Sequence, residues 1–307
     1  MIGIGGWGKN HVRVLNELDA LAAVCDADRE RMQLYSKKYR VPGYESVDSM
    51  LKKEKLDGVT ICTPASTHFA IASKVLGEGL NTFVEKPMTT ASKDGESLIE
   101  VAKKARKVLA VGFIERFNPP ISDLKKMIKE GRLGAPILLE FHRENRRGDV
   151  LDVGIVKDAS VHDIDTARWL FGEEPRVVFA RVGNVKSDNG DEDFAAIMLG
   201  FGEQRTAFIT TNWVTPARVR TLEAVFANGV VNVDFVSQQT QVHEEDGTRI
   251  PKLVIQEPLM LELKEYLAAI EEKRQPLVRG EDGVMVTRIA EAVLALSHSG
   301  TPIFMKP

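Results

Sequence analysis

A glycine-rich run opens the sequence, and its spacing matches the G-x-G-x-x-G turn that binds dinucleotides. The run is Gly3-Ile4-Gly5-Gly6-Trp7-Gly8, and a helical pattern begins near Lys9. The first glycine of such a motif permits a tight turn, the second lets a pyrophosphate approach the backbone, and the third lets the helix pack closely. The helix N-terminus then faces the phosphates. We therefore predict dinucleotide contacts from Gly3, Gly5, Gly6, Trp7 and Gly8; the alternative is a tight turn without a ligand.

An acidic residue follows the next predicted strand. Asp26 ends the apolar run Leu21–Cys25 and lies 18 residues after Gly8. A carboxylate at this place accepts hydrogen bonds from ribose hydroxyls and repels a 2′-phosphate. The sequence therefore predicts NAD as the cofactor, while Arg29 keeps NADP open as the less favoured alternative.

Two further groups of polar residues have spacings that suit chemistry. Glu85-Lys86-Pro87 follows the predicted strand Thr82–Val84, and the strand C-termini are where a doubly wound sheet builds its ligand site. Asp158 and His162 are four residues apart, so on one helix they share a face and the carboxylate can orient the imidazole. Each group also has a plain interpretation. Glu85 and Lys86 can form a surface ion pair, and Asp158 can cap a helix that carries a core histidine.

The elements that must position these residues fall into two patterns. Up to about Phe117 the chain alternates short apolar runs with helical patterns, which indicates right-handed crossovers and a parallel sheet covered on both faces. The predicted strands are Leu21–Cys25, Leu56–Cys62, Thr82–Val84 and Val108–Phe113, and the predicted helices are Lys9–Leu18, Arg29–Tyr39, Phe69–Leu80 and Gly95–Ala105. Only Met1 and Ile2 precede Gly3, so either the central strand is very short or it begins upstream.

After Phe117 the pattern changes. Helix Pro119–Glu130 leads into the long strand Ile137–Glu144 and a helix around His162–Leu170, and successive antiparallel strands follow from Arg176 to about Ile255. Three pairs tolerate the positive φ angles of tight hairpins, namely Asn189-Gly190, Asn228-Gly229 and Asp246-Gly247. Two amphipathic helices close the chain. The sequence thus predicts an α/β Rossmann domain over residues 1–117. Residues 118–307 are predicted to form an α+β domain with a large open, mainly antiparallel sheet. The last helix, 284–297, is expected to be able to pack back on the first domain.

Composition narrows the class of protein. The 307 residues are 43% hydrophobic and 28% charged with a formal net charge of −3, which fits a globular protein and disfavours nucleic-acid and membrane-surface partners. Two cysteines, Cys25 and Cys62, without a Cys-x-x-Cys pair, argue against a disulfide framework or a metal cluster. No apolar stretch reaches the roughly 18 residues of a membrane span. No charged leader precedes the glycine turn. We therefore expect a cytoplasmic protein.

Taken together, the motifs resemble those of the Gfo/Idh/MocA oxidoreductases. The matching residues are the glycine turn, Thr63-Pro64 with His68, Glu85-Lys86-Pro87, Arg116-Phe117-Asn118-Pro119, and the run from Asp158 to Asp165. They occur in the family's order up to about residue 172. The strand-rich region beyond matches in pattern rather than in signature.

The resemblance implies roles for these residues. Lys86 would touch both the substrate hydroxyl and the cofactor ribose, Glu85 would bind the nicotinamide-side ribose, and Pro87 would follow a cis peptide bond. His162 would remove the hydroxyl proton, because histidine titrates near neutrality, and Asp158 would orient it. Asp165 ranks behind them as a supporting residue. Thr63, Pro64, His68 and Arg116 are expected to contact the cofactor.

Arginines and one tryptophan bear on the substrate. Arg143, Arg146 and Arg147 precede Asp158, and arginine forks bind phosphate well, so Arg143 and Arg147 are predicted substrate contacts unless the loop is simply solvated. Trp213 can stack on a sugar or uracil ring or belong to the core. Some similar family members oxidise C3 of UDP-N-acetylglucosamine, which favours a sugar-nucleotide substrate over inositol or a free aldose.

Two other classes of function remain possible, and the sequence also bears on the oligomeric state. An NAD-dependent glycoside hydrolase would oxidise C3 only transiently, and an NAD(H) sensor would bind the cofactor without turnover. The predicted open sheet of the second domain has one face without an obvious cover. Such a face usually meets another subunit, so we expect a homodimer or homotetramer.

Overall fold

The computed structural model describes residues 1–146, 152–186, 190–299 and 301–305, which form two compact units. The first unit consists of Met1–Phe113 and Leu259–Thr287, and the second of Ile114–Pro258 and the segment from Arg288 onward. This division differs from the predicted domains at the C-terminal end, because residues 259–287 belong with the first unit. The segment that returns to the first unit begins at Leu259, before the predicted helix 284–297. Most of that helix lies in the second unit.

A parallel sheet forms the core of the first unit. Its strands are β1 (Val24–Cys25), β2 (Gly43–Tyr44), β3 (Gly58–Ile61), β4 (Asn81–Glu85) and β5 (Leu109–Gly112). β1 pairs with β2, and β3, β4 and β5 pair in that order. Ile2 bridges Cys25 on one side and Ile61 on the other, so a single residue stands in the place of the central strand. The sheet is therefore continuous, and its central strand is very short.

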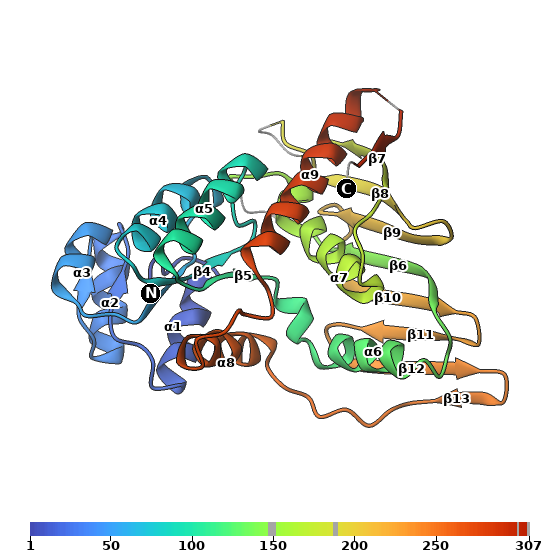
Figure 1. Cartoon of the computed structure of the whole chain (residues 1–307), viewed down its shortest axis with the longest axis horizontal. Helices are drawn as coiled ribbons and strands as arrows, with labels where there is room; N and C mark the ends of the chain where they lie inside the picture. The colour runs from blue at the N-terminus through green and yellow to red at the C-terminus, as the bar shows by residue number, and fades with distance from the viewer. Residues whose placement is uncertain (147–151, 187–189, 300, 306–307) are drawn as a thin grey trace. The chain divides into compact units, whose positions relative to one another are not determined.

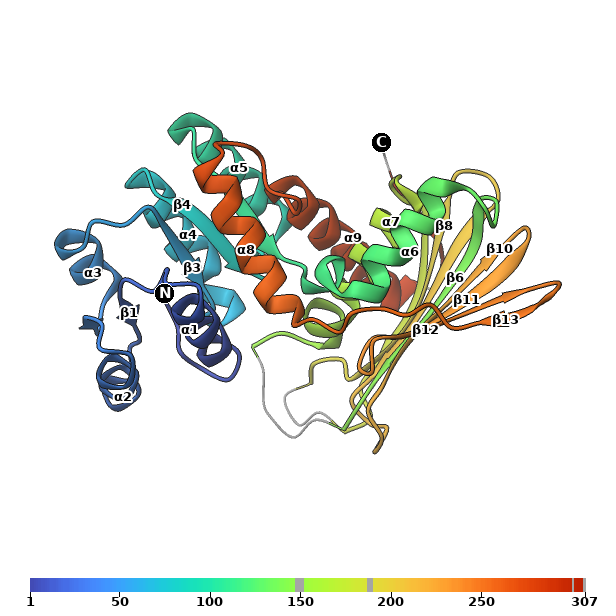
Figure 2. The same ribbon diagram turned by 90° about the horizontal axis from the view of Figure 1, so that it is seen from below.

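Helices cover both faces of this sheet. They are α1 (Gly8–Glu17), α2 (Arg29–Tyr39), α3 (Val47–Lys53), α4 (Ala65–Gly77), α5 (Ser92–Ala105), α8 (Pro258–Glu271) and the start of α9 (Gly280–Ser299). Figures 1 and 2 show α4 and α5 on one face of the sheet and α1 and α8 on the other. Among the described residues, no helix combines the length and the apolar character needed to cross a bilayer.

Tyr266 explains why α8 belongs to the first unit. Its ring packs edge-on against Phe83, with ring centroids 5.5 Å apart, and its hydroxyl donates to the carbonyl of Val59 over 3.3 Å. Gly58 permits this approach, because a Cβ there would lie 2.6 Å from the tyrosine hydroxyl oxygen. A helix far along the chain thus completes the cover of the Rossmann sheet.

A nine-stranded sheet dominates the described part of the second unit. Its strands are β6 (Pro136–Glu144), β7 (Val177–Gly183), β8 (Phe194–Phe201), β9 (Arg205–Asn212), β10 (Val219–Phe226), β11 (Gly229–Asp234), β12 (Gln239–Glu244), β13 (Gly247–Arg249) and β14 (Ile303–Phe304). Their order is β13-β12-β11-β10-β6-β9-β8-β7-β14. All neighbours pair antiparallel except β6 and β9, which run parallel. The predicted large, mainly antiparallel sheet is confirmed.

One face of the large sheet carries the helices of the second unit (Figure 2). They are a 3-10 turn (Ile114–Phe117), α6 (Pro119–Glu130), a π-helical segment (Val156–Ser160) and α7 (Val161–Phe171). Leu222 and Ala224 of β10 pair with Val233 and Val231 of β11, and all four side chains are buried. The predicted hairpin at Asn228-Gly229 is confirmed, as is the one at Asp246-Gly247. The pair Asn189-Gly190 lies partly outside the described residues.

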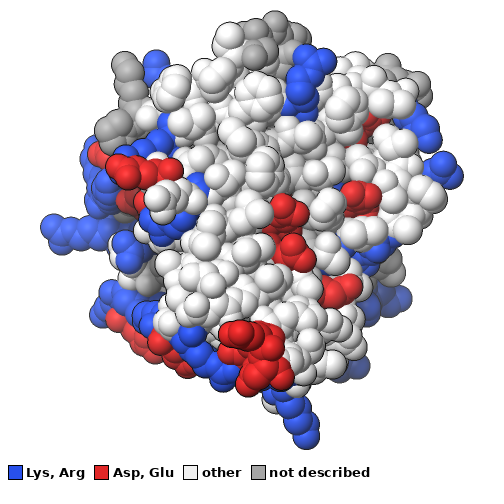
Figure 3. Space-filling model, turned by 90° about the vertical axis from the view of Figure 1, so that its right-hand side faces the viewer, with Lys and Arg blue, Asp and Glu red and all other residues white. Residues whose placement is uncertain are grey.

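The opposite face of the large sheet is mostly uncharged, with several acidic side chains near its middle and basic ones mainly towards its rim (Figure 3). One row of cross-strand neighbours runs through Phe179, Met198, Phe208, Glu140 and Glu223. Phe179 and Phe208 are 37% and 43% exposed. Two glutamates stand directly opposite each other beside them, an arrangement that destabilises an isolated sheet.

Candidate active site

Gly3 and Gly8 form the tight turn that the sequence predicts. Gly3 has φ +84°, and a Cβ there would lie 2.8 Å from the Cys62 backbone. A Cβ on Gly8 would lie 1.9 Å from the carbonyl oxygen of Gly3. Only glycine fits these two positions, so the turn brings the start of α1 directly against the strand ends.

The space before α1 suits a phosphate group. An added Cβ on Gly5 or Gly6 would meet no atom within 4 Å, so a ligand can approach the backbone there. No acidic residue occupies the first turn of α1, and Trp7 at its N-cap gives no side-chain cap. The positive end of the helix dipole therefore favours an anion there. The residues present therefore fit the pyrophosphate of a dinucleotide.

Asp26 stands at the end of β1, beside the glycine turn. Its Oδ2 accepts from the Ile4 amide over 2.7 Å and its Oδ1 from the Asp28 amide over 2.8 Å. Arg31 Nε lies 3.2 Å from the same Oδ2. The carboxylate is held in a fixed direction and keeps lone pairs for a ribose hydroxyl. Arg31, which the sequence analysis did not single out, adds a cation beside this carboxylate.

Glu85 ends β4 and gathers three donors. Its Oε1 accepts from Trp7 Nε1 and faces His11 Nε2, both over 2.9 Å, and its Oε2 accepts from the Lys86 amide over 3.1 Å. Burial alone would raise the pKa of Glu85, but the hydrogen bond and charge of His11, with help from Lys86 and Trp7, hold it below its ordinary value. A Cβ on Gly112 would lie 2.8 Å from this carboxylate. Glu85 is thus a buried, ionised group at the carboxyl edge of the sheet.

His68 braces the loops after β3 and β4. Its Nδ1 lies 2.8 Å from the Pro87 carbonyl and its Nε2 lies 2.9 Å from the Thr63 carbonyl. The Lys86-Pro87 peptide bond is cis, as the resemblance implies. With 1% exposure, His68 holds the Lys86 loop and Thr63-Pro64 together, and its contact with the cofactor stays a prediction. Thr63 and Pro64 lie at the carboxyl end of β3, before α4.

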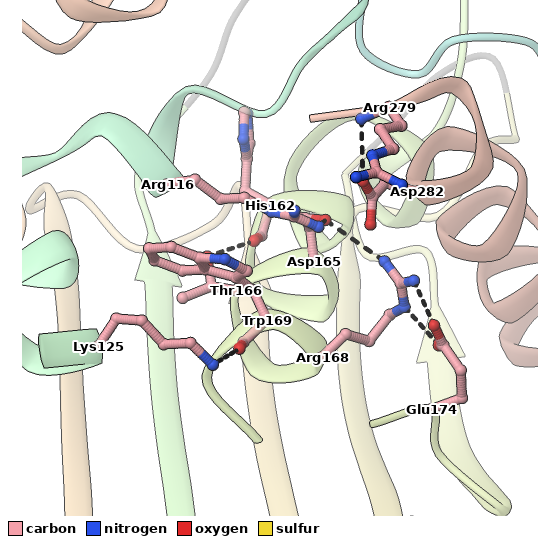
Figure 4. Close-up of polar contacts among 10 residues, drawn as sticks. All are labelled: Arg116, Lys125, His162, Asp165, Thr166, Arg168, Trp169, Glu174, Arg279 and Asp282. Atoms are coloured by element: carbon pink, nitrogen blue, oxygen red, sulfur yellow. Dashed lines mark hydrogen bonds and ion pairs between the residues drawn. The ribbon is translucent and has the colours of Figure 1, made fainter. Parts of the chain in front are cut away.

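Asp158 and His162 lie on one continuous helix in the second unit. Asp158 belongs to the π-helical segment and His162 to the first turn of α7. Glu192 caps the start of this helix, because its carbonyl and its Oε1 accept from the Ile155 and Val156 amides over 3.0 and 3.2 Å. The helix cap is therefore Glu192 rather than Asp158. In Figure 4 the imidazole of His162 points away from the neighbouring ion pairs.

Arg143 is buried between two carboxylates of the second unit. Its guanidinium forms a fork with Asp163, with contacts of 2.7–3.1 Å, and its Nη2 lies 3.1 Å from Glu115. The side chain is 4% exposed and stacks over the ring of Phe235. Burial alone would lower the pKa of Arg143, but the charges of Asp163 and Glu115 raise it above its ordinary value. Internal carboxylates thus occupy the fork, and the phosphate contact at Arg143 stays a prediction.

Arg116 is likewise engaged within the second unit (Figure 4). Its Nε and Nη2 donate to the two oxygens of Asp165 over 2.7 and 2.6 Å, and its guanidinium lies over the ring of Trp169. Arg168 joins Asp165 to Glu174. Arg116 is 4% exposed, and its contact with the cofactor stays a prediction. Asp165 holds two arginines in place.

Trp213 directly follows the last residue of β9, an inner strand of the large sheet. Its amide donates to the Asp193 carbonyl over 2.9 Å, and the side chain of Asn212 accepts from the Val214 and Thr215 amides. Ser160 Oγ lies 2.6 Å from Thr211 Oγ1, which ties the π-helical segment to the same end of β9. Half-buried Trp213 thus stands near the segment that carries Asp158. Arg147 lies outside the described residues.

His11, Arg31 and Glu192 are the site residues that sequence reasoning missed. His11 follows Trp7 by four residues in the first turns of α1, so both side chains lie on one helix face and reach Glu85. That spacing was the available signal for His11. No short-range pattern links Glu192 to a helix that starts at residue 155.

Both units match known protein families. Residues 1–113 match the oxidoreductase family with an NAD-binding Rossmann fold, and residues 121–232 match the GFO/IDH/MocA C-terminal domain. UDP-N-acetylglucosamine 3-dehydrogenase from Acidithiobacillus ferrooxidans is 28% identical over 96% of this chain and 94% of its own length. Its solved structure covers 97% of this chain and 96% of its own, with a TM-score of 0.89.

A second relative has a different substrate in its name. Myo-inositol 2-dehydrogenase from Thermotoga maritima is 28% identical over 95% of this chain and 93% of its own length. The fold is also that of the WlbA dehydrogenase from Bordetella pertussis in complex with NADH and UDP-GlcNAcA, at 21% identity and a TM-score of 0.86. The match to both domain families, in the predicted order, confirms the resemblance: this chain belongs to the GFO/IDH/MocA family of oxidoreductases, with an NAD-binding Rossmann domain.

Proposed function

We propose that this chain is a dehydrogenase that moves hydride between a sugar or sugar-nucleotide carbinol and NAD. The observation that carries the proposal is the polar edge of the Rossmann sheet, where Asp26 at the end of β1 and Glu85 and Lys86 at the end of β4 lie beside an open glycine turn. An edge of this kind serves both to bind a dinucleotide and to work on a hydroxyl next to it. The two curated relatives described above are named as dehydrogenases of a sugar nucleotide and of a cyclitol.

Each of the chain's own residues has one task in this proposal. NAD supplies the hydride acceptor when it is bound. His162 accepts the hydroxyl proton, Asp158 orients its imidazole, and the Lys86 ammonium stabilises the negative charge that develops on the carbinol oxygen. Glu85 holds the ribose next to the nicotinamide, and its hydrogen bonds from Trp7 and His11 keep the carboxylate ionised for that purpose.

For the substrate we propose a sugar nucleotide oxidised at C3. The full-length likeness to a UDP-N-acetylglucosamine 3-dehydrogenase supports this, as does Trp213, which stands ready to stack on a ring. With Arg143 paired internally, Arg220 takes over as the candidate for a phosphate contact. It is half-buried and pairs with Arg143 across β10 and β6, and burial with that neighbouring charge lowers its pKa to about 10, so it stays cationic at neutral pH. Arg147 remains a further candidate.

The test is an initial-rate screen with NAD⁺ against UDP-N-acetylhexosamines, free aldoses and inositols, following NADH at 340 nm as is standard for this cofactor. We expect the highest kcat/KM with a UDP-N-acetylhexosamine. A higher value with an inositol would replace the substrate and keep the reaction. Release of aglycone from an aryl glycoside with trace NAD⁺ would instead indicate a transient oxidation, and cofactor binding without any turnover would refute the proposal.

We propose NAD rather than NADP as the working cofactor. Asp26 lies where it would repel a 2′-phosphate, and family members bind NAD. Arg31 and Arg29 work in the opposite direction, so we expect some residual use of NADP rather than none. The ratio of kcat/KM for NAD⁺ to that for NADP⁺ tests this, and a ratio below one would contradict it.

We also propose that the open face of the large sheet joins two copies of this chain. Phe179, Met198 and Phe208 form its apolar half, and the adjacent glutamates Glu140 and Glu223 need a cation that a second copy can bring. A row that is apolar at one end and acidic at the other suits a two-fold interface in which each copy covers the other.

A charge placed in the apolar half tests the interface. Phe208→Asp should shift the protein from dimers or tetramers towards monomers in sedimentation, because a carboxylate would be buried there without a partner. Leu34→Asp is the matched control, since Leu34 is a 63% exposed apolar residue of the first unit. A monomeric wild-type protein, or an unchanged oligomer for Phe208→Asp, would refute the interface.

A further inference from the structure

A cavity of about 640 Å³ lies within the first unit, away from the glycine turn. Its walls come from the ends of α5 and α8, the start of α9, and the residues that begin β4 and β5. Asp26, Glu85 and Lys86 lie at the carboxyl ends of the parallel strands, whereas Asn81, Val108 and Leu109 of this cavity lie at the opposite ends. We infer that this cavity is a second ligand site, separate from the cofactor, for a small organic phosphate.

The charge of the lining identifies an anion as its ligand. The basic side chains are Lys103, Arg106, Lys107, Lys273 and Arg274, and the acidic ones are Asp57 and Glu281. The lining therefore has a formal excess of three positive charges, although the whole chain carries a net charge of −3. A concave basic surface on an acidic protein concentrates anions locally.

The five basic side chains differ in whether an acidic side chain of the protein already pairs with them. Arg274 is forked onto Glu265, with contacts of 2.6 and 2.7 Å, and also meets Glu272. Lys103 lies 3.5 Å from Glu100 and 3.9 Å from Glu281. For Arg106, Lys107 and Lys273, by contrast, no ion pair within 4 Å is found among the residues that the structure describes. These three side chains can bind a doubly charged phosphate without breaking an internal contact.

Apolar residues form the floor of the cavity, and they restrict the class of anion that would bind best. Ile99, Ala102, Val108 and Leu109 are buried there, and Ile270 of α8 joins them. Free inorganic phosphate would use the basic rim and leave this floor uncovered. A phosphate monoester with an apolar or aromatic group would use both, and the area it covers would add to the affinity.

The experiment is calorimetric titration of the full-length protein, saturated with NADH so that the glycine turn is occupied. Phenyl phosphate serves as the probe, with inorganic phosphate for comparison. We expect phenyl phosphate to bind with a sub-millimolar Kd, more tightly than inorganic phosphate, and to bind more weakly as salt is added. Neither this site nor its test depends on which sugar the enzyme oxidises.

A double variant assigns the binding to this cavity. Arg106→Gln with Lys107→Gln should weaken phenyl phosphate binding about tenfold or more, since each side chain offers a charged hydrogen bond. The matched control is Arg40→Gln with Lys37→Gln. Arg40 and Arg106 both end a helix in the left-handed conformation, with φ 57° and 55°, but Arg40 and Lys37 do not line the cavity.

The outcomes separate cleanly. A selective loss in the Arg106/Lys107 variant, with the control within about twofold of wild type, supports the site. Absence of binding to the wild type, or equal affinity in both double variants, overturns it. Equal affinity for phenyl phosphate and inorganic phosphate would overturn the proposed ligand class, because the apolar floor would then contribute nothing.

Discussion

The two units use their buried charges in different ways. In the first unit Glu85 collects donors from Trp7, His11 and Lys86 at the edge of the sheet, beside a glycine turn with open space before it. In the second unit Arg143 lies between Asp163 and Glu115, with 4% exposure. The first arrangement lies at the sheet edge that we propose as the cofactor site, and the second is buried among its own ion-pair partners. A charged residue within a family motif can therefore either bind a ligand or stabilise the fold. Its contacts in the structure are needed to distinguish the two roles.

The largest effect that we expect comes from breaking the buried arrangement of the second unit. Arg143→Met should lower the free energy of unfolding by about 3–5 kcal/mol, because it leaves two carboxylates buried without their cation. Urea denaturation of the apoprotein measures this. Arg132→Met is the control, since Arg132 pairs with Glu244 at the surface, and we expect little change there. A stable Arg143→Met protein that has lost only its affinity for substrate would reverse our assignment.

At the sheet edge of the first unit we expect a substitution to reduce activity rather than stability. Lys86→Ala should reduce kcat about 10²–10³-fold through loss of charge stabilisation at the reacting oxygen, while the free energy of unfolding stays nearly unchanged. Steady-state kinetics and urea denaturation together separate the two effects. Lys93→Ala, at an exposed position of α5, should alter neither. Full activity in Lys86→Ala would remove this residue from the proposed mechanism.

Asp26 should affect cofactor choice more than stability. Asp26→Asn keeps the acceptor oxygen for the Ile4 amide but removes the charge, so we expect NAD⁺ affinity to fall about tenfold and NADP⁺ affinity to rise. Fluorescence titration with NADH and NADPH gives both constants. If the preference for NADH over NADPH does not move, the carboxylate does not select the cofactor.

The smallest effect concerns acid stability. The pKa of Glu85 is lowered from its ordinary value of 4.5, so its contribution to folding is present above that pH and is lost as the pH falls through the lowered pKa. The wild type should therefore be more stable than Glu85→Gln at pH 6, and the difference should shrink below about pH 4.5. Unfolding free energies at a series of pH values measure this. A difference that grows on acidification would mean that Glu85 is protonated in the folded protein.

Some elements could be predicted to the residue because their end signals are local. Helix α2 begins at Arg29, where Asp28 caps it by accepting from the Arg31 amide, and ends before Arg40 in the left-handed conformation. Helix α6 begins at Pro119 and ends before Gly131, the usual signals for a start and a stop. Strand β2 and helix α3 were missed, since two and seven residues are too short to show a period.

Other features depend on partners that are distant in sequence. The parallel pairing of β6 and β9 and the return of α8 to the first unit are decided by packing, as with Tyr266 on Phe83. The contacts of an arginine side chain likewise depend on partners that are distant in sequence. Arg116 and Arg143 have sequence contexts that fit ligand binding, but Asp165 and Asp163 on α7 accept them instead. The family motifs thus predict the region of the site, but they do not separate ligand contacts from supporting ion pairs.

The π-helical segment Val156–Ser160 gives the helix of Asp158 and His162 an adjustable register. A π turn holds one residue more than the α turn it replaces, so removing a single residue from this segment would restore a regular α-helix. The wide turn takes up the extra residue locally, so such a deletion would leave the helix on either side in nearly the same phase and change only which side chains lie on the turn itself. Asp158 lies on that turn, whereas Asp163 and Asp165 lie beyond it on α7. In evolutionary terms, gain or loss of one codon here could reposition Asp158 without disturbing the ion pairs of Asp163 and Asp165.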